Sequence, residues 1–243
     1  MKIIGHRGGI PRKPESTIAA FAQAARLGAH GVEFDVQQCL DGELVVIHDF
    51  TLDRTTTGSG LVAGKTWAEL RSLDAGSWHD PAFINERIPS LEMVLELEEL
   101  DFELELKGFG DEYLGSVLSR VRQAGVLDRV EFTSSNVPLL ALLKQQTPEA
   151  TVGFFSQAKP PSFSDEAYEH YITGVASTAP FDVAHVHAKH ISPSITARLH
   201  EQGLLVHAND ATNPEDVRRA LEAGADKLST DDVAMALSVV ASL

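Results

Sequence analysis

The chain has 243 residues and a mass of 26.3 kDa, a length that suits one large domain with a sizeable buried core. Hydrophobic residues make up 43% of it and charged residues 23%, which excludes wholesale disorder. The 35 acidic and 20 basic residues leave a formal net charge of −15. Such a surface repels phosphate backbones and anionic headgroups, so nucleic acids and membrane surfaces are not expected partners. An anionic small-molecule substrate would therefore need a local cation to hold it.

Cysteine content and hydropathy bear on the compartment. The single cysteine, Cys39, cannot form an internal disulfide, which is typical of a reducing environment. The first residues run directly into strand-like sequence without the apolar core of a signal peptide. No stretch approaches the roughly 20 apolar residues that a membrane span needs. These features favour a cytoplasmic protein and say nothing of its oligomeric state.

Short apolar runs alternate with helical patterns along the chain. The first helix is predicted to start at a cap on Ser16, to carry apolar residues at helical spacing and to end at Gly28. Ser192-Pro193 and Asn213-Pro214 each place a capping residue before a proline, which predicts two further helix starts. The strands predicted between the helices are Lys2–Gly5, Gly31–Val36, Phe102–Leu106, Val130–Thr133, Thr151–Phe155, Val183–His187, Leu204–Ala208 and Lys227–Thr230.

This alternation predicts an α/β fold with parallel strands. Eight strand–helix units over this length favour a (β/α)8 TIM barrel, formed as a single domain over residues 1–243. A doubly wound open sheet remains the alternative, because a count of strands does not prove that the sheet closes.

One segment interrupts the alternation. Asp41-Gly42 lies between two strand-like runs and predicts a hairpin in which Leu44–His48 returns antiparallel. A two-residue turn would place Asp35 opposite His48, so a carboxylate and an imidazole would project from one side of the sheet. Residues 51–88 then form a long insertion rich in Thr, Gly and Asp. Long connections of this kind are usually functional, and this one would lie at the catalytic face of a barrel.

Three carboxylates are expected to meet at that face. Glu33 and Asp35 share one side of the second predicted strand, and Glu105 lies near the end of the next barrel strand. Carboxylates that converge repel one another unless a cation neutralises them, and an oxygen-only set favours Mg²⁺ or Ca²⁺. The alternative is that they form ion pairs with Arg7 and Lys107 and hold no metal.

Histidines and two basic residues are the remaining candidates for the site. His6 and His48 lie at strand ends beside the acidic residues and suit acid–base catalysis near neutral pH. Arg7 and Lys107 are the local cations that could hold a phosphate. The spacing of His185, His187 and His190 resembles a metal-binding tract. A strand puts only the first two on one face, however, and no third ligand is evident, so zinc is not expected there.

The motifs resemble those of the glycerophosphodiester phosphodiesterases. The resemblance covers nearly the whole chain and is densest in the first 107 residues. It is carried by Gly5-His6-Arg7-Gly8-Gly9, Pro14-Glu15-Ser16-Thr17, Gly28–Val36, Asp41–Asp49, Leu52-Asp53-Arg54-Thr55-Thr56, Glu86–Leu91 and Glu103-Leu104-Glu105-Leu106-Lys107, and more faintly by Leu204–Asp232.

This resemblance implies a TIM barrel with an insertion after its second strand. It also implies metal-dependent hydrolysis of glycerophosphodiesters to sn-glycerol 3-phosphate and an alcohol. Carried over residue by residue, the metal ligands would be Glu33, Asp35 and Glu105, the acid–base pair His6 and His48, and the phosphate-binding residues Arg7 and Lys107. Three alternatives stay open: a lysophospholipase D-like activity, a cyclising phosphodiesterase, and a non-catalytic barrel that binds phosphorylated ligands.

The chain departs from the family pattern at three places. Ser16 and Glu103 each stand where the family commonly has Asn. The family's Trp-Thr-Val-Asn stretch on the penultimate strand is replaced by His207-Ala208-Asn209-Asp210. A tryptophan that would line the glycerol or alcohol end of the substrate is therefore missing, which leaves the preferred alcohol open.

Overall fold

The computed structural model of the chain describes residues 1–9, 11–156 and 158–242. Its strands are β1 (Lys2–Gly5), β2 (Gly31–Gln38), β3 (Leu44–Val46), β4 (Asp101–Leu106), β5 (Val130–Ser134), β6 (Thr151–Phe155), β7 (Val183–His187), β8 (Leu205–Ala211) and β9 (Lys227–Thr230). The α-helices are α1 (Ile18–Leu27), α2 (Trp67–Leu70), α3 (Leu91–Leu95), α4 (Gly110–Ala124), α5 (Val137–Gln146), α6 (Asp165–Ala176), α7 (Pro193–Glu201), α8 (Pro214–Ala223) and α9 (Val233–Ala241). Short 3₁₀ helices are η1 (His6–Gly8), η2 (Val62–Gly64), η3 (Pro81–Phe83) and η4 (Leu127–Arg129).

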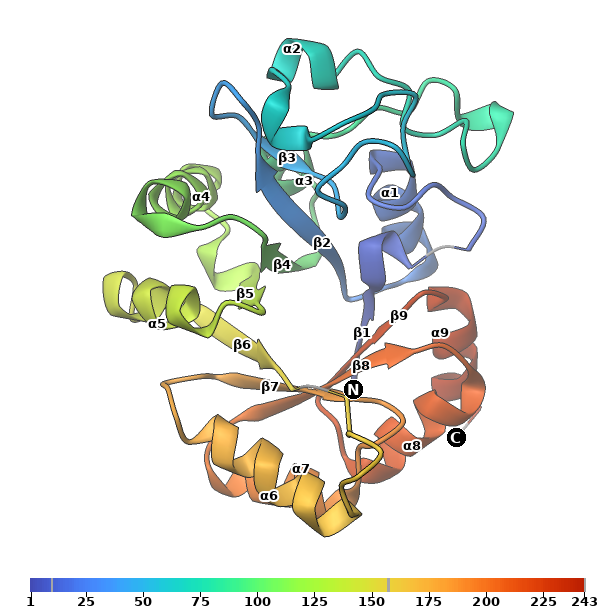
Figure 1. Cartoon of the computed structure of the whole chain (residues 1–243). Helices are drawn as coiled ribbons and strands as arrows, with labels where there is room; N and C mark the ends of the chain where they lie inside the picture. The colour runs from blue at the N-terminus through green and yellow to red at the C-terminus, as the bar shows by residue number, and fades with distance from the viewer. Residues whose placement is uncertain (10, 157, 243) are drawn as a thin grey trace.

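The sheet closes into a barrel. Its strand order is β1-β9-β8-β7-β6-β5-β4-β2-β3, and a further pairing of β1 with β2 joins the two ends. All pairs are parallel except β2 with β3, so β3 lies outside the cylinder as the return strand of a hairpin. Helices surround the strands (Figure 1). The predicted TIM barrel is therefore confirmed and the open-sheet alternative is wrong.

The start of α1 differs from the prediction. Thr17, not Ser16, caps the helix, and its side chain accepts a hydrogen bond from the Ala20 amide. Ser16 instead has φ 55°, in the left-handed region where Asn is favoured over most residues. The caps at Ser192 and Asn213 are as predicted, each followed by proline at the first helical position.

The hairpin forms, but its predicted register is wrong by one residue. Val36 pairs with Val46, and the Ile47 amide donates to the Asp35 carbonyl, so Ile47 rather than His48 lies opposite Asp35. The cause is an extra residue in the turn, where Gly42 adopts φ 87°. Glycine takes this left-handed conformation without steric cost and allows a three-residue loop.

The insertion has a small core of its own. Residues from this segment, which contains η2, α2 and η3, pack on the outer side of the hairpin. Its buried apolar members are Leu52, Val62, Leu70, Ala75 and Ile88, which contact Cys39, Val45 and Ile47 of the hairpin. The segment (cyan in Figure 1) therefore stands over β2 and β3.

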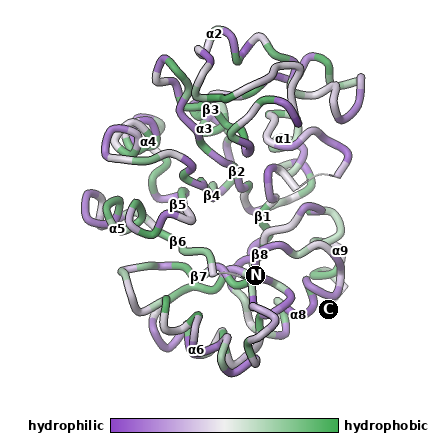
Figure 2. Tube along the Cα trace, in the orientation of Figure 1, coloured by the Kyte–Doolittle hydropathy of each residue, from purple (hydrophilic) through white to green (hydrophobic). Residues whose placement is uncertain are grey.

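The apolar core lies outside the cylinder, between the sheet and the helices. Helices such as α4 and α5 alternate hydrophobic and hydrophilic residues along the chain (Figure 2), and their apolar sides join the main hydrophobic cluster. TIM-barrel interiors are usually packed with Val, Ile and Leu. This interior instead carries buried charged and polar side chains, which include Glu33, Glu103, Glu131, His185 and His207. Among the described residues, no helix combines the length and the apolar character needed to cross a bilayer.

The Phe34→Ala substitution tests the outer core. The Phe34 ring is fully buried, with its centroid 5.9 Å from those of both Phe21 and Phe102. Its loss leaves a cavity and is expected to lower the free energy of unfolding by about 3–5 kcal/mol, measured by chemical denaturation. Phe109→Ala is the matched control, because Phe109 is 74% exposed and its loss should change stability by less than about 0.5 kcal/mol. Equal effects of the two substitutions would contradict this assignment of the core.

Candidate active site

A tight turn after β1 positions the first two candidate residues. Arg7 has φ 50°, a strained conformation for a side-chain-bearing residue, and Gly8 and Gly9 also have positive φ. A Cβ on Gly5 would lie 2.6 Å from the Gly8 carbonyl oxygen, so the turn requires glycine there. In this turn the Arg7 amide donates a 2.9 Å hydrogen bond to Glu33. The turn thus fastens His6 and Arg7 to the first carboxylate.

The three predicted carboxylates converge. One oxygen from each of Glu33, Asp35 and Glu105 lies within 4.8 Å of the others. Glu33 and Asp35 are only 4% and 0% exposed. Burial, and then the charges of Asp35 and Glu105, raise the pKa of Glu33 well above its usual range. Burial and the charge of Asp35 likewise raise the pKa of Glu105.

These carboxylates fit a hard divalent cation. Lys107 Nζ lies 2.7 Å from Glu105 and 3.0 Å from Asp35, and Arg7 Nε lies 3.8 Å from Asp35. Neither contact to Asp35 is aligned as a hydrogen bond, so both buried Asp35 oxygens lack a hydrogen-bond partner among the described residues. The ion pairs of the metal-free alternative therefore exist, yet they leave Asp35 without hydrogen bonds and Glu33 with a raised pKa. Oxygen ligands in this state suit Mg²⁺ or Ca²⁺.

Each candidate histidine is paired with an aspartate. His6 Nδ1 lies 2.6 Å from Asp231, and His48 Nδ1 lies 2.6 Å from Asp49. Hydrogen bonding to the imidazoles helps lower the pKa of both aspartates, so each carboxylate accepts and each Nδ1 donates. This arrangement leaves both Nε2 atoms for chemistry. His6 Nε2 lies 3.8 Å from Glu33, and the charge of His48 acts on Glu105.

An arginine from the insertion connects the two sides of the site. Arg54 donates to both oxygens of Asp49 over 2.7 and 2.9 Å, and to both oxygens of Glu15 over 2.7 and 2.8 Å. Glu15 in turn accepts from Arg7 over 3.2 Å. A continuous chain of charged hydrogen bonds therefore runs from His48 to Arg7. Through it the insertion holds a histidine and a cation in place.

Asp231→Asn tests the pairing of His6. Burial alone would lower the pKa of His6, but the hydrogen bond and charge of Asp231 raise it above its usual value. Asparagine removes the charge, so the pKa of His6 is expected to fall, and its ring to lose its proton at lower pH. An NMR titration of the imidazole in metal-free protein measures this shift. An unchanged His6 pKa would contradict the pairing.

A cavity of about 250 Å³ lies at the carboxyl ends of the strands, where His6, Glu33 and Glu105 line it. A bulge between Ala208 and Ala211 in β8 re-aims the chain there. The other lining residues are Glu103, Phe155, Asn209, Asp210 and Ser229. An aromatic ring from β6 thus lines the mouth in a chain that lacks the tryptophan of the family pattern.

A second polar cluster lies deeper in the barrel. Lys227 Nζ lies 2.6 Å from Glu131, and Glu131 lies 2.6 Å from His185 Nε2. Beyond them are Glu103 and His207, which are 4% and 0% exposed. Burial raises the pKa of Glu103 to about 8 and lowers the pKa of His207 well below its usual range. His185 thus has partners on β4, β5 and β8, in addition to its neighbours on its own strand.

The structure brings the predicted site residues to one end of the barrel. The carboxylates lie together, Arg7 and Lys107 contact them, and His6 lies beside Glu33. His48 also lies at this end, although the predicted register of the hairpin was wrong, because β3 ends at Val46 and the chain after it is free to turn toward the site. No role was predicted for four residues that the structure brings to the site: Asp231, Asp49, Arg54 and Glu15. Each of the four nevertheless carried a signal: Asp231 follows the last barrel strand, Asp49 adjoins His48, and Arg54 and Glu15 lie in motifs that carry the family resemblance.

Comparisons with known proteins identify the family of the chain. The model of the glycerophosphoryl diester phosphodiesterase family matches residues 6–235. A glycerophosphodiester phosphodiesterase of Caldanaerobacter subterraneus subsp. tengcongensis is 35% identical over 249 residues, covering 98% of this chain and 97% of that protein. The fold is similar to that of an Oleispira antarctica phosphodiesterase solved with the product sn-glycerol-3-phosphate, with a TM-score of 0.86, 27% identity, and coverage of 99% and 97%. A glycerophosphodiester phosphodiesterase of Agrobacterium tumefaciens has a TM-score of 0.85, 26% identity, and coverage of 99% of both chains.

Proposed function

The chain belongs to the glycerophosphoryl diester phosphodiesterase family, and from this membership we propose that it hydrolyses glycerophosphodiesters to sn-glycerol 3-phosphate and an alcohol. The observation that carries the proposal is the meeting of three carboxylates and two histidine–aspartate pairs at the barrel mouth. The product named in the Oleispira structure is the one that this reaction would release.

The metal ligands we propose are Glu33, Asp35 and Glu105, with Mg²⁺ or Ca²⁺ as the ion. A divalent cation there supplies positive charge that offsets the charge of the phosphodiester and of its transition state. Arg7 and Lys107 contribute in the same way, because both side chains already lie at the edge of the carboxylate cluster. These two cations would hold the phosphate in an otherwise acidic protein.

His6 and His48 are the proposed acid–base pair. One imidazole takes a proton from the nucleophile through Nε2, and the other donates a proton to the departing alcohol oxygen. Asp231 and Asp49 keep the Nδ1 proton in place and stabilise the charged rings. The nucleophile is water or the adjacent glycerol hydroxyl, and the latter would pass through a cyclic phosphate, detectable by ³¹P NMR.

The wider setting of the activity is also proposed. The chain would act as one domain on a small phosphodiester, without nucleic acid partners, since its net charge of −15 repels polyanions. A cytoplasmic location agrees with its single cysteine, which is buried and free.

The decisive experiment measures the release of glycerol 3-phosphate from glycerophosphocholine with Mg²⁺ or Ca²⁺, before and after EDTA. Turnover that EDTA abolishes supports the proposal. Turnover that survives EDTA would favour ion pairing without metal, and tight ligand binding without turnover would favour a binding barrel. Lysophosphatidylcholine as a second substrate tests the lysophospholipase D-like alternative, which predicts faster cleavage of that lipid.

A further inference from the structure

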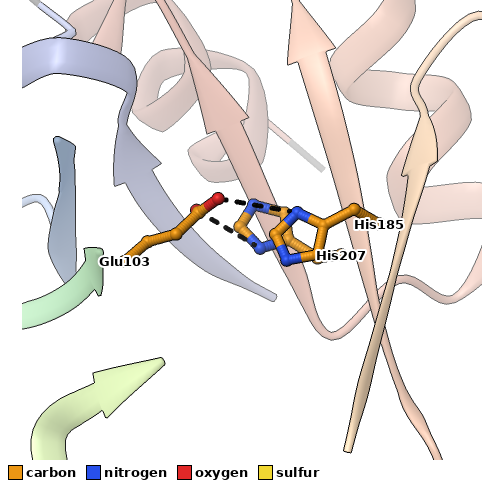
Figure 3. A group of neighbouring side chains, drawn as sticks. All are labelled: Glu103, His185 and His207. Atoms are coloured by element: carbon orange, nitrogen blue, oxygen red, sulfur yellow. Dashed lines mark ion pairs between the residues drawn. The ribbon is translucent and has the colours of Figure 1, made fainter. Parts of the chain in front are cut away.

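Two histidine rings are stacked in the barrel interior beside Glu103, a carboxylate that also lines the cavity at the mouth. The rings of His185 on β7 and His207 on β8 have centroids 4.3 Å apart and planes 29° apart. Glu103 on β4 reaches toward both rings (Figure 3). One possible ligand atom from each of the three residues lies within 4.8 Å of the others. Their two nitrogens and one carboxylate make a donor set unlike the oxygen-only set at the mouth.

The spacing of these atoms suits ligands of one ion better than it suits hydrogen bonds. His185 Nδ1 lies 3.5 Å from one oxygen of Glu103, and His207 Nδ1 lies 3.6 Å from the other. Hydrogen bonds between such groups are usually 2.7–3.2 Å long. Two ligands of a tetrahedral zinc ion, each about 2.0–2.1 Å from the metal, are about 3.4 Å apart.

The buried atoms that face this space lack hydrogen bonds. Within the described residues, neither ring nitrogen of His207, nor His185 Nδ1, nor Glu103 Oε2 has a hydrogen-bond partner. Both histidines are 0% exposed and Glu103 is 4% exposed. Buried polar groups in native proteins nearly always have a hydrogen-bond partner, and a bound ion is one of the few explanations when several groups without a partner point together. The buried atoms without partners therefore indicate a ligand between the three side chains.

Neighbouring residues hold His185 in the orientation of a metal ligand. Its Nε2 lies 2.6 Å from Glu131, so the ring presents Nδ1 to Glu103. A histidine that binds a metal through one ring nitrogen usually donates a hydrogen bond from its other ring nitrogen, often to a carboxylate. Gly153 makes room for this pair, because a Cβ there would lie 2.5 Å from Glu131 and 2.8 Å from His185.

We propose that Glu103, His185 and His207 bind a second divalent ion, of the zinc class, inside the barrel. Imidazole nitrogen suits Zn²⁺ and related transition metals, whereas the carboxylates at the mouth suit Mg²⁺ or Ca²⁺. A cavity of about 320 Å³ on the amino-terminal side of the barrel is lined by Glu103 and His207, together with Lys2, Asp101, Glu131 and Lys227. It offers an ion a path that does not cross the mouth.

Such an ion would have a structural effect. It would connect β4 with β7 and β8, which do not neighbour β4 in the sheet. It would also replace the apolar packing that usually fills the interior of a TIM barrel. An ion that binds only the folded chain raises the melting temperature, so Zn²⁺ is expected to stabilise the protein even when the mouth is saturated with Mg²⁺.

The test uses Co²⁺ as a spectroscopic substitute for Zn²⁺, added to the full chain in excess Mg²⁺. The wild type is expected to bind one Co²⁺ with the strong visible absorption of a low-coordinate nitrogen-ligated ion. His207→Gln should weaken binding by at least about 100-fold, and Glu131→Gln by about 10–100-fold. His187→Gln is the matched control, because His187 also lies on β7 but accepts a hydrogen bond from the Lys189 amide. Its absorption should stay that of the wild type.

A second measurement needs no variant, in case His207→Gln does not fold. Anomalous diffraction from Zn²⁺-soaked wild-type crystals should show a peak between Glu103 and the two rings. A peak only at the mouth or on surface histidines would overturn the proposal, as would an unchanged Co²⁺ spectrum in folded His207→Gln. Loss of the peak with retained phosphodiesterase activity in Glu131→Gln would support a structural role. The Co²⁺ spectrum and the anomalous peak do not depend on the proposed hydrolysis.

Discussion

Replacing His6 or His48 with alanine is expected to lower kcat by about 10²–10⁴-fold while the fold stays intact. Each imidazole has its Nδ1 bonded to an aspartate, so its Nε2 is held ready to move a proton. Removing either ring forces an unassisted proton transfer, either at the nucleophile or at the departing alcohol. Release of glycerol 3-phosphate under saturating substrate measures the loss, and circular dichroism verifies the fold.

His200→Ala is the matched control for these two variants. His200 Nε2 lies 2.8 Å from Asp226, so this residue is also part of a histidine–aspartate pair. Asp226 precedes β9 and therefore lies at the amino-terminal end of the barrel, opposite the mouth. Turnover in His200→Ala should equal that of the wild type. Wild-type turnover in His6→Ala or His48→Ala would remove that residue from the mechanism.

A substrate with a better leaving group assigns the two roles. Nitrophenolate departs without protonation, so a glycerophosphodiester of p-nitrophenol does not need a general acid. The variant that lacks the acid should recover most of its activity on this substrate, and the variant that lacks the base should remain slow. Equal recovery in both would contradict the division of roles between His6 and His48.

Glu33→Gln is expected to raise the Mg²⁺ or Ca²⁺ concentration for half-maximal activity by at least about 100-fold. The substitution removes one of three proposed ligands, and even residues that only orient a ligand typically contribute 10–100-fold to metal affinity. Metal titration of EDTA-treated enzyme gives the shift, and calorimetry reports binding without turnover. Glu92→Gln is the control, because Glu92 forms an ion pair with Arg120 on the outside of the barrel. An unchanged metal titration in Glu33→Gln would count against its ligand role.

The stability of this variant should change in the opposite direction to its activity. The pKa of Glu33 is raised in the folded state, so its ionised form destabilises the metal-free fold at neutral pH. Glutamine removes that repulsion, and the metal-free variant is expected to melt at or above the temperature of the metal-free wild type. Added Mg²⁺ should stabilise the wild type and leave the variant unchanged. A large loss of stability in the metal-free variant would mean that Glu33 serves mainly in structural ion pairs.

Closure of the barrel brings the residues of the proposed site together. Glu33, Asp35 and Glu105 come from two neighbouring strands, and β4 pairs with β2 so that Asp35 lies beside Glu105. His6 reaches them because β1 pairs with β2 and closes the cylinder. Asp231 follows β9, which pairs with β1, and so it lies beside His6 although the two are 225 positions apart.

The barrel strands, several helix starts and the residues that gather at the carboxyl ends could all be predicted from the amino-acid sequence. Alternating apolar runs, capping residues and prolines are local signals, and parallel strands bring their ends to one face whatever the details of packing. Glu33, Asp35, Glu105, His6 and His48 could therefore be named as one site. The motifs of the family named them independently.

Contacts that depend on strand register and on the pairing of distant segments could not be predicted and became visible in the folded chain. One additional residue in the turn that contains Gly42 shifts the register of the hairpin, so Ile47 and not His48 lies opposite Asp35. Because side chains alternate between the faces of a strand, a shift of one residue also exchanges the faces. Thr17, not Ser16, caps α1, because Thr17 has the extended backbone of a capping residue whereas Ser16 has a left-handed φ of 55°. His185 stacks on His207 because the two are register partners on the neighbouring strands β7 and β8. Glu103 lies on a distant strand and meets them only across the interior of the closed barrel, so no spacing along one strand predicts this cluster.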